Sequence, residues 1–302
     1  MTARAFLGAL LAACAAGPLH ADPAAWRAVS PDGGELWLLG SMHYLKESDY
    51  PLPASIDRLF ANADALALEL DLDDLDPAAE QAALLGAAVL PPGVSLADVL
   101  GEAGYARAAE QAAALGVDLA LLERFEPWLV AITLLDRGMS RLGYRSDRGV
   151  ERYLVRKAQE AGKEIVGLET TAAQIAVFDA LPQEEQRGLL EQTLQELAKP
   201  ASAIEQLAEL WRAGELETLA RELEGEFEGF PELYRALVVE RNERWIPVIE
   251  GFLREPRRYL VVVGALHLVG RGSVVELLEQ RGYKVERLPD ETEASRSASS
   301  SL

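Results

Sequence analysis

The 302-residue chain is poor in cysteine, in histidine and in positive charge, with one cysteine, three histidines and 29 lysine plus arginine residues. A single cysteine cannot close an internal disulfide, so a disulfide-stabilised scaffold is excluded. The 49 aspartate and glutamate residues give a formal net charge of −20. Nucleic-acid binding depends on clustered positive charge, so we expect no nucleic-acid partner. Chemistry that requires imidazole must use very few residues.

Long apolar runs are absent after residue 21. The start of the chain combines Arg4, an apolar run over 5–16 and a small residue, Ala21, at a cleavage position. This order predicts a secretory signal peptide over 1–21 and a periplasmic or secreted bacterial protein. The run is too short to span a bilayer, so we expect no membrane span. As an alternative, residues 11–14 match a bacterial lipobox, which would anchor the protein through a lipid on Cys14.

The rest of the chain has the pattern of an α/β fold. Short apolar runs that read as strands alternate with amphipathic segments that read as helices, which predicts a central, mostly parallel sheet flanked by helices. The strands are expected at 26–30, 35–39, 65–70, 163–168, 258–263 and 283–288.

We expect one domain over 22–289, with helical insertions at about 77–147 and 182–230 that would suit a lid. The insertions are rich in alanine, leucine and glutamate and carry no strand signal. Residues 231–253 predict one long helix with a kink or break at Pro247. The Ser/Glu-rich tail over 290–302 is expected to be disordered.

Both histidines beyond the leader lie in the same local context. His43 and His267 each follow an apolar strand, a glycine and two further residues, in Gly40-Ser-Met-His43 and Gly264-Ala-Leu-His267. Ligands of open α/β sheets bind where strands end. If the two strands are near neighbours, the two imidazoles converge on one metal ion or one substrate. The alternative is a pair of ordinary core or surface histidines, which the shared context disfavours.

Two glutamates also end apolar strands. Glu69 closes the run over 65–70, and Glu169 closes the run over 163–168. A charged residue at such a position is costly to bury without a partner. Two histidines with these carboxylates form a ligand set suited to Zn²⁺ or Mn²⁺, and a spare glutamate could act as general base on bound water. The alternative for each glutamate is a helix cap or a solvated acid.

Arg241 and Asn242, with Trp245 one turn later, form a further candidate group. Arginine and asparagine can hold a carboxylate or carbonyl oxygen, and a tryptophan can wall a pocket. An exposed salt-bridge set with Glu240 and Glu243 explains the same residues equally well. The chain lacks the Gly-x-Ser-x-Gly elbow, the phosphate-binding glycine loop and the His-Glu-x-x-His helix, so serine-hydrolase and nucleotide chemistry lose support.

Together these motifs resemble the TraB/GumN family. The resemblance runs from about Trp26 to Leu288 and rests on the two Gly-x-x-His turns, with Glu69, Gly167-Leu-Glu169-Thr170, Arg241-Asn242 and the element Gly149-Val150-Glu151. That family is related to the TIKI metalloproteases and, more distantly, to the erythromycin esterase and ChaN-type fold. The resemblance implies that His43, His267 and Glu69 are catalytic or metal-binding and that Glu169 and Arg241 support them.

The expected function is therefore a metal-dependent, peptidase-like hydrolase of the cell envelope, acting on a peptide or small molecule. With only two histidines, carboxylates must complete a metal site, so Mn²⁺ or Co²⁺ fits at least as well as Zn²⁺. Two alternatives remain open: an esterase that works through histidine without metal, and a non-catalytic envelope protein that captures a peptide or pheromone-like ligand.

Overall fold

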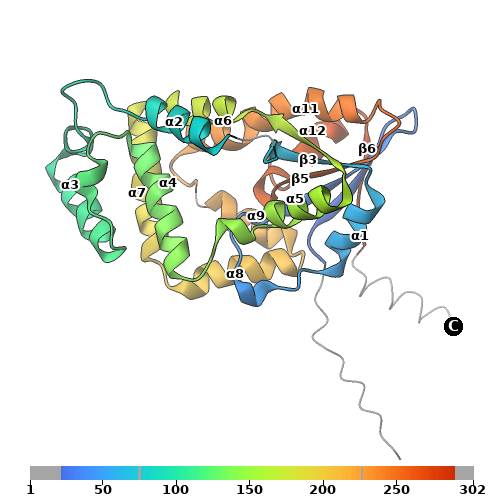
Figure 1. The fold of residues 1–302 in the computed structure, drawn as a ribbon, viewed down its shortest axis with the longest axis horizontal. Helices are drawn as coiled ribbons and strands as arrows, with labels where there is room; N and C mark the ends of the chain where they lie inside the picture. Colours follow the sequence, from blue (N-terminus) through green and yellow to red (C-terminus); the bar gives the residue numbers. More distant parts are fainter. Residues whose placement is uncertain (1–21, 74–75, 226, 290–302) are drawn as a thin grey trace, which may run out of the picture.

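The structure is a computed structural model that describes residues 22–73, 76–225 and 227–289 (Figure 1). The predicted signal peptide, the lipobox cysteine Cys14 and the predicted disordered tail over 290–302 lie outside the described residues. Among the helices within the described ranges, none is both long and apolar enough to cross a bilayer.

A six-stranded sheet forms the centre of the molecule, in the order β4-β3-β5-β2-β1-β6. The four strands β4, β3, β5 and β2 are mutually parallel, and β1 runs antiparallel to both β2 and β6. The mostly parallel sheet predicted from the sequence is thus confirmed. The strands are β1 (Ala25–Val29), β2 (Glu35–Ser41), β3 (Ala65–Leu70), β4 (Glu164–Glu169), β5 (Tyr259–Gly264) and β6 (Lys284–Arg287).

Helices cover both faces of the sheet, so strands such as β5 are buried along their whole length. One face packs against α11 (Glu240–Phe252) and α12 (Val274–Gln280). The other face packs against α1 (Ala54–Asn62) and α5 (Val150–Ala161), with Trp211 from α8 (Ala201–Arg212) and Leu219 from α9 (Leu216–Gly225).

A separate helical region lies beside the sheet, with α4 and α7 running next to each other (Figure 1). Residues of α3, α4 and α7 share an apolar core distinct from the two sheet cores, and a smaller cluster joins Trp128 to Ile175. The helices of this region are α2 (Pro77–Ala87), α3 (Leu96–Ala114), α4 (Pro127–Arg141), α6 (Thr171–Asp179) and α7 (Gln183–Ala198).

The segment predicted as one helix over 231–253 has its irregularity at a different place. It consists of α10 (Pro231–Tyr234), a π-helical stretch (Arg235–Val239) and α11, and α11 continues through Pro247. Of the kink or break expected at Pro247, the break is therefore wrong. Ile246 and Ile249, on either side of the proline, are fully buried against the sheet, and this packing holds the helix together across it.

Candidate active site

The two Gly-x-x-His turns lie next to each other at one edge of the sheet. Strands β2 and β5 are parallel neighbours, and Ser41 pairs with Gly264 at their ends. A side chain on Gly264 would place its Cβ 3.0 Å from Nε2 of His43, so only glycine lets β5 pass this closely. The same strand-end geometry therefore carries His43 and His267 into one site.

Glu69 stands between the two imidazoles. Glu69 projects from β3, which pairs with β5 on the side opposite β2, and it is only 8% exposed. Its Oε1 atom lies 3.8 Å from Nε2 of His43 and 3.9 Å from Nε2 of His267. The backbone N–H of Gly264 donates to the same oxygen at 2.9 Å. One carboxylate oxygen of Glu69 thus lies almost equally far from one nitrogen of each imidazole.

A second set of residues fixes how the two rings point. Nδ1 of His43 lies 2.7 Å from Oε1 of Glu151, and Nδ1 of His267 lies 2.7 Å from Oδ1 of Asn242. Asn242 in turn donates from Nδ2 to the carbonyl of Gly272 at 2.8 Å, which fixes the orientation of its amide. Because both partners of the Nδ1 atoms are acceptors, each Nδ1 carries the hydrogen and each Nε2 is directed towards Glu69.

Glu151 reaches His43 because helix α5 begins against the turn after β2. A Cβ on Gly149 would overlap the carbonyl oxygen of His43, so glycine is needed at that position. The N–H of Val150 donates to Met42 O at 3.1 Å, and the Ser41 hydroxyl donates to the Glu151 carboxylate. Sequence reasoning did not select Glu151 or Ser41 as site residues. The only signal was the short Gly149-Val150-Glu151 element, which pointed to no partner.

Arg241 joins Glu69 to Glu169. Its Nη2 atom donates to Oε2 of Glu69 at 2.5 Å and to Oε1 of Glu169 at 2.6 Å, and its Nη1 lies 3.2 Å from Nε2 of His267. The Nε1 atom of Trp245 donates to the other oxygen of Glu169 at 3.1 Å. Glu169 is therefore held behind Arg241 and does not touch the two histidines directly.

Burial decides whether Arg241, Asn242 and Trp245 of α11 belong to the site or to an exposed salt-bridge set. Arg241 is 7% exposed, and Asn242 and Trp245 are fully enclosed. These three residues form an inward-facing group of the site, while Glu240 pairs with Arg235 on the outside of the helix. The exposed salt-bridge set is excluded for Arg241.

The ionisation of the site follows from its charges. Burial would raise the pKa of Glu69, but the neighbouring histidines and the guanidinium of Arg241 outweigh it and hold that pKa below its usual range. Burial lowers the pKa of His267 to about 3, so this imidazole is neutral at neutral pH. The carboxylate of Glu151 raises the pKa of His43. Because 54% of the His43 side chain is exposed, solvent screens that pair.

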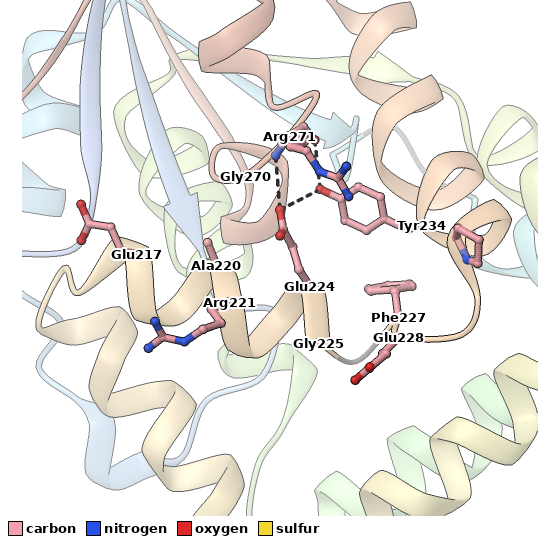
Figure 2. Close-up of a pocket in the computed structure, with 11 residues that line it drawn as sticks. Glu217, Ala220, Arg221, Glu224, Gly225, Phe227, Glu228, Tyr234, Gly270 and Arg271 are labelled. Atoms are coloured by element: carbon pink, nitrogen blue, oxygen red, sulfur yellow. Dashed lines mark hydrogen bonds between the residues drawn. The ribbon is translucent and has the colours of Figure 1, made fainter.

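Residues of α9 and α10 hold the loop that follows His267. Figure 2 shows Glu224 of α9 and Tyr234 of α10 directed at Arg271, at the rim of a cavity of about 540 Å³. Oε1 of Glu224 accepts from the Arg271 N–H at 3.2 Å, and the Tyr234 hydroxyl donates to the Arg271 carbonyl at 3.0 Å. Burial raises the pKa of Tyr234 to about 12, so the hydroxyl remains protonated and able to donate.

Comparison with known proteins identifies the family. A model described as the TraB/PrgY/gumN family matches residues 24–287. The chain belongs to this family. A similar protein of Escherichia coli (strain K12), "Uncharacterized protein YbaP", is 28% identical over 257 residues, which cover 84% of this chain and 92% of the relative. The TraB/PrgY/gumN resemblance expected from the motifs is thus confirmed.

A shorter match connects this TraB/PrgY/gumN chain to a metalloprotease. A protein of Amphimedon queenslandica named "Metalloprotease TIKI homolog" is 37% identical over 79 residues, which cover 25% of this chain and 16% of the relative. No solved structure matches the chain.

Proposed function

We propose that the protein is a hydrolase that cleaves an amide or ester bond, with its reacting water activated between His43, Glu69 and His267. The observation that carries the proposal is the convergence of two imidazole nitrogens on one ionised carboxylate oxygen, at 3.8 and 3.9 Å. The similarity to a protein named as a metalloprotease supports the same reaction class.

The donor chemistry of this cluster fits a divalent cation. Nδ1 of His43 and Nδ1 of His267 are each hydrogen-bonded to an acceptor oxygen. This arrangement is typical of metal-binding histidines, in which the nitrogen that does not bind the metal donates to a carboxylate or carbonyl oxygen. Charge balance points the same way, because the cluster holds three largely enclosed carboxylates, Glu69, Glu151 and Glu169, and Arg241 pairs with only Glu69 and Glu169. The carboxylate of Glu151, with a smaller contribution from Glu69, raises the pKa of His43, and the same two carboxylates would stabilise a bound cation.

His43 Nε2, His267 Nε2 and Glu69 Oε1 would hold Mn²⁺, Co²⁺ or Zn²⁺. When bound, the cation would act as a Lewis acid that lowers the pKa of its water. The chain's own residues perform the remaining tasks. Glu151 and Asn242 keep the rings in place, while Arg241 keeps Glu69 ionised and presents positive charge near the developing oxyanion.

A cation-free hydrolase is the second candidate, and Arg241 favours it. Its Nη1 atom already uses the lone pair of His267 Nε2. Within the described ranges, moreover, no three His, Cys, Asp or Glu side chains are grouped so that they could hold a metal ion as they stand. In this version neutral His43 takes the proton from water, which restricts activity to pH values above its raised pKa.

Metal analysis and kinetics separate the two candidates. We expect about one divalent cation per chain in the purified protein, and at least a tenfold loss of bound metal in His43→Ala and in His267→Ala. Activity on a panel of peptides and esters should fall after chelation and return with Mn²⁺, Co²⁺ or Zn²⁺. Glu102→Gln, on the exposed surface of α3, is the matched control.

The remaining outcomes are equally informative. Full activity after chelation, abolished by His43→Ala, would favour the cation-free hydrolase. A peptide that binds with unchanged mass, and no hydrolysis of any substrate, would contradict the hydrolase and favour a protein that captures peptides.

We also propose that the protein works in the cell envelope, on the strength of its predicted signal peptide. Fractionation should place it in the periplasm or medium, and mass spectrometry should find a mature chain that starts at Asp22. A lipid on Cys14 in the membrane fraction would establish the lipoprotein instead, and a cytoplasmic chain that keeps residues 1–21 would contradict export.

A further inference from the structure

One nitrogen of Arg241 has two acceptors within reach. Its Nη1 atom lies 3.2 Å from Nε2 of His267 and 3.3 Å from the carbonyl oxygen of Leu237, which belongs to the π-helical stretch before α11. A guanidinium is always protonated and can only donate, so Nε2 of His267 must supply its lone pair to this contact. A metal ion binds a neutral imidazole through the same lone pair. Arg241 and a cation would therefore compete for one atom of the site.

The guanidinium has other anchors that do not involve His267. Nη2 and Nε of Arg241 both donate to Oε1 of Glu169, at 2.6 and 3.0 Å, and Nη2 also donates to Oε2 of Glu69. The guanidinium carbon lies 4.8 Å from the centre of the Trp245 ring, which adds a cation–π contact. If Nη1 moves away from His267, these contacts hold the guanidinium in the site, and the carbonyl oxygen of Leu237 remains an acceptor for Nη1.

The two imidazoles differ in how easily a cation reaches them. Within the described residues, Nε2 of His43 makes no hydrogen bond to a guanidinium, and 54% of the His43 side chain is exposed. His267 is only 6% exposed and has Arg241 against its Nε2 atom. A cation from solvent can thus bind at His43 and Glu69 first, and its bond to His267 requires that Nη1 leave.

We propose that Arg241 is a reversible cap on the proposed cation site: its Nη1 atom holds Nε2 of His267 until a divalent cation displaces it towards the carbonyl of Leu237. The cap lowers the affinity for cations that prefer nitrogen ligands, so the bound cation exchanges with solvent. This inference rests on the cation-dependent form of the proposed hydrolase and adds how that site is loaded.

Arg241→Lys tests the cap in the full chain. Lysine keeps a positive charge beside Glu69 and Glu169, but it lacks the separate nitrogen with which the guanidinium fork reaches His267. We expect the chelator-treated variant to bind Zn²⁺ at least tenfold more tightly than the native protein does, because one hydrogen bond to a charged group is worth about that factor. Titration calorimetry measures the two affinities.

Arg212→Lys is the matched control for this substitution. Arg212 is a half-buried arginine that pairs with Asp49 and not with a carboxylate of the cluster, so its replacement should leave the Zn²⁺ affinity unchanged. An Arg241→Lys variant that is folded by circular dichroism and binds Zn²⁺ no more tightly than the native protein would overturn the cap.

Magnesium distinguishes the loss of the cap from a general change in the charge of the site. Mg²⁺ prefers oxygen ligands to imidazole, so its affinity should be the same in the native protein and in Arg241→Lys. A gain for Mg²⁺ as large as the gain for Zn²⁺ would trace the effect to the carboxylates and overturn the assignment to His267.

A crystal structure of the native protein with Zn²⁺ tests the cap without any substitution. We expect Zn²⁺ on Nε2 of His267, with Nη1 of Arg241 beyond hydrogen-bonding distance of that atom and still donating to Leu237. Zn²⁺ bound to His43 and Glu69 while the contact between Arg241 and His267 persists would overturn the proposal.

The outcomes also separate the cap from the hydrolase. Equal Zn²⁺ affinities in the native protein and Arg241→Lys, with metal-dependent hydrolysis, would leave the hydrolase standing and overturn the cap. Tighter binding in Arg241→Lys, without hydrolysis of any peptide or ester by the native protein, would support the cap and contradict the hydrolase. Zn²⁺ binding by neither protein would overturn the cap, and any hydrolysis would then belong to the cation-free candidate.

Discussion

At the scale of single residues, Arg241 holds the site together. Its guanidinium lies between Glu69 and Glu169, and both carboxylates are largely shielded from water. The shared guanidinium offsets the cost of enclosing two carboxylates, because burial penalises an unpaired ion. Arg241 therefore sets both the stability of the site and the ionised state of Glu69.

Arg241→Met should destabilise the protein by about 3–5 kcal/mol, because it leaves two enclosed carboxylates without their cation. Urea unfolding measures the change in the free energy of unfolding. Arg258→Met is the matched control, since the pair of Arg258 with Asp64 is exposed and screened by solvent, so its loss should cost far less stability. Equal losses in the two variants would show that the buried bridge is no stronger than a surface pair.

His267 should make stability depend on pH. Burial lowers its pKa from 6.5 to about 3, so in the window between these values the unfolded chain binds a proton that the folded chain does not. The free energy of unfolding of the chelator-treated protein should therefore decrease as the pH is lowered. His267 should contribute a slope of up to about 1.4 kcal/mol per pH unit between pH 6 and 5. Denaturant titrations at several pH values measure this slope.

His267→Gln should lack that contribution to the slope, and His43→Gln should keep it. The pKa of His43 is raised, so below pH 6 its imidazole is protonated in both states and adds no slope there. A wild-type slope equal to that of His267→Gln would show that His267 is not held neutral.

At the scale of elements, the π-helical stretch and two glycine-containing turns determine which side chains enter the site. The stretch over Arg235–Val239 lies directly before Arg241 and Asn242 and changes the helical phase in which these two residues emerge. At the strand ends, Gly264 keeps the backbone of β5 within reach of His43 and Glu69. The geometry of the site thus depends on the course of the backbone as much as on the side chains of His43 and Glu69.

Gly264→Ala should reduce turnover at least tenfold while leaving the protein folded. The new Cβ would lie 3.0 Å from Nε2 of His43 and 3.5 Å from Oε1 of Glu69, so it displaces the imidazole from its position. Steady-state kinetics with thermal unfolding checks both parts. Gly251→Ala, on α11 with open space around it, should keep full activity and gain up to about 1 kcal/mol of stability. Unchanged turnover in Gly264→Ala would contradict the required close approach.

At the scale of the whole molecule, the helical region and the sheet have separate apolar cores. Residues of α3, α4 and α7 pack mainly among themselves, whereas β5 is buried on both faces at the centre of the sheet. Regions with a small core of their own open at lower free energy than the central core.

Hydrogen exchange should therefore be faster in α3, α4 and α7 than in β2 and β5. Exchange followed by mass spectrometry measures this difference, with α11, which packs on the sheet, as the reference for a well-protected helix. Equal protection in α4 and β5 would show that the two cores unfold as one unit.

The sequence predicted the strands well, because continuous apolar runs such as Leu66–Leu68 reflect burial on both faces. It also predicted that Glu69 lies at the end of one strand and that His43 lies just past the end of another. It could not predict the partners: Arg241 is 172 residues from Glu69, and no spacing rule connects a helix to a strand at that separation. Glu151 was missed because an acid in the first turn of an amphipathic helix looks like any surface acid.

The histidines of the two Gly-x-x-His turns have different hydrogen-bond acceptors at Nδ1: a carboxylate for His43 and a neutral amide for His267. Because of this difference, the two sides of the site differ in how readily their imidazole binds a proton. The imidazole of His43 tends to hold a second proton and that of His267 resists one, so only the His43 side of the site can readily donate a proton. In the cation-free hydrolase proposed above, the departing amine or alcohol would therefore have to lie on the His43 side of the site.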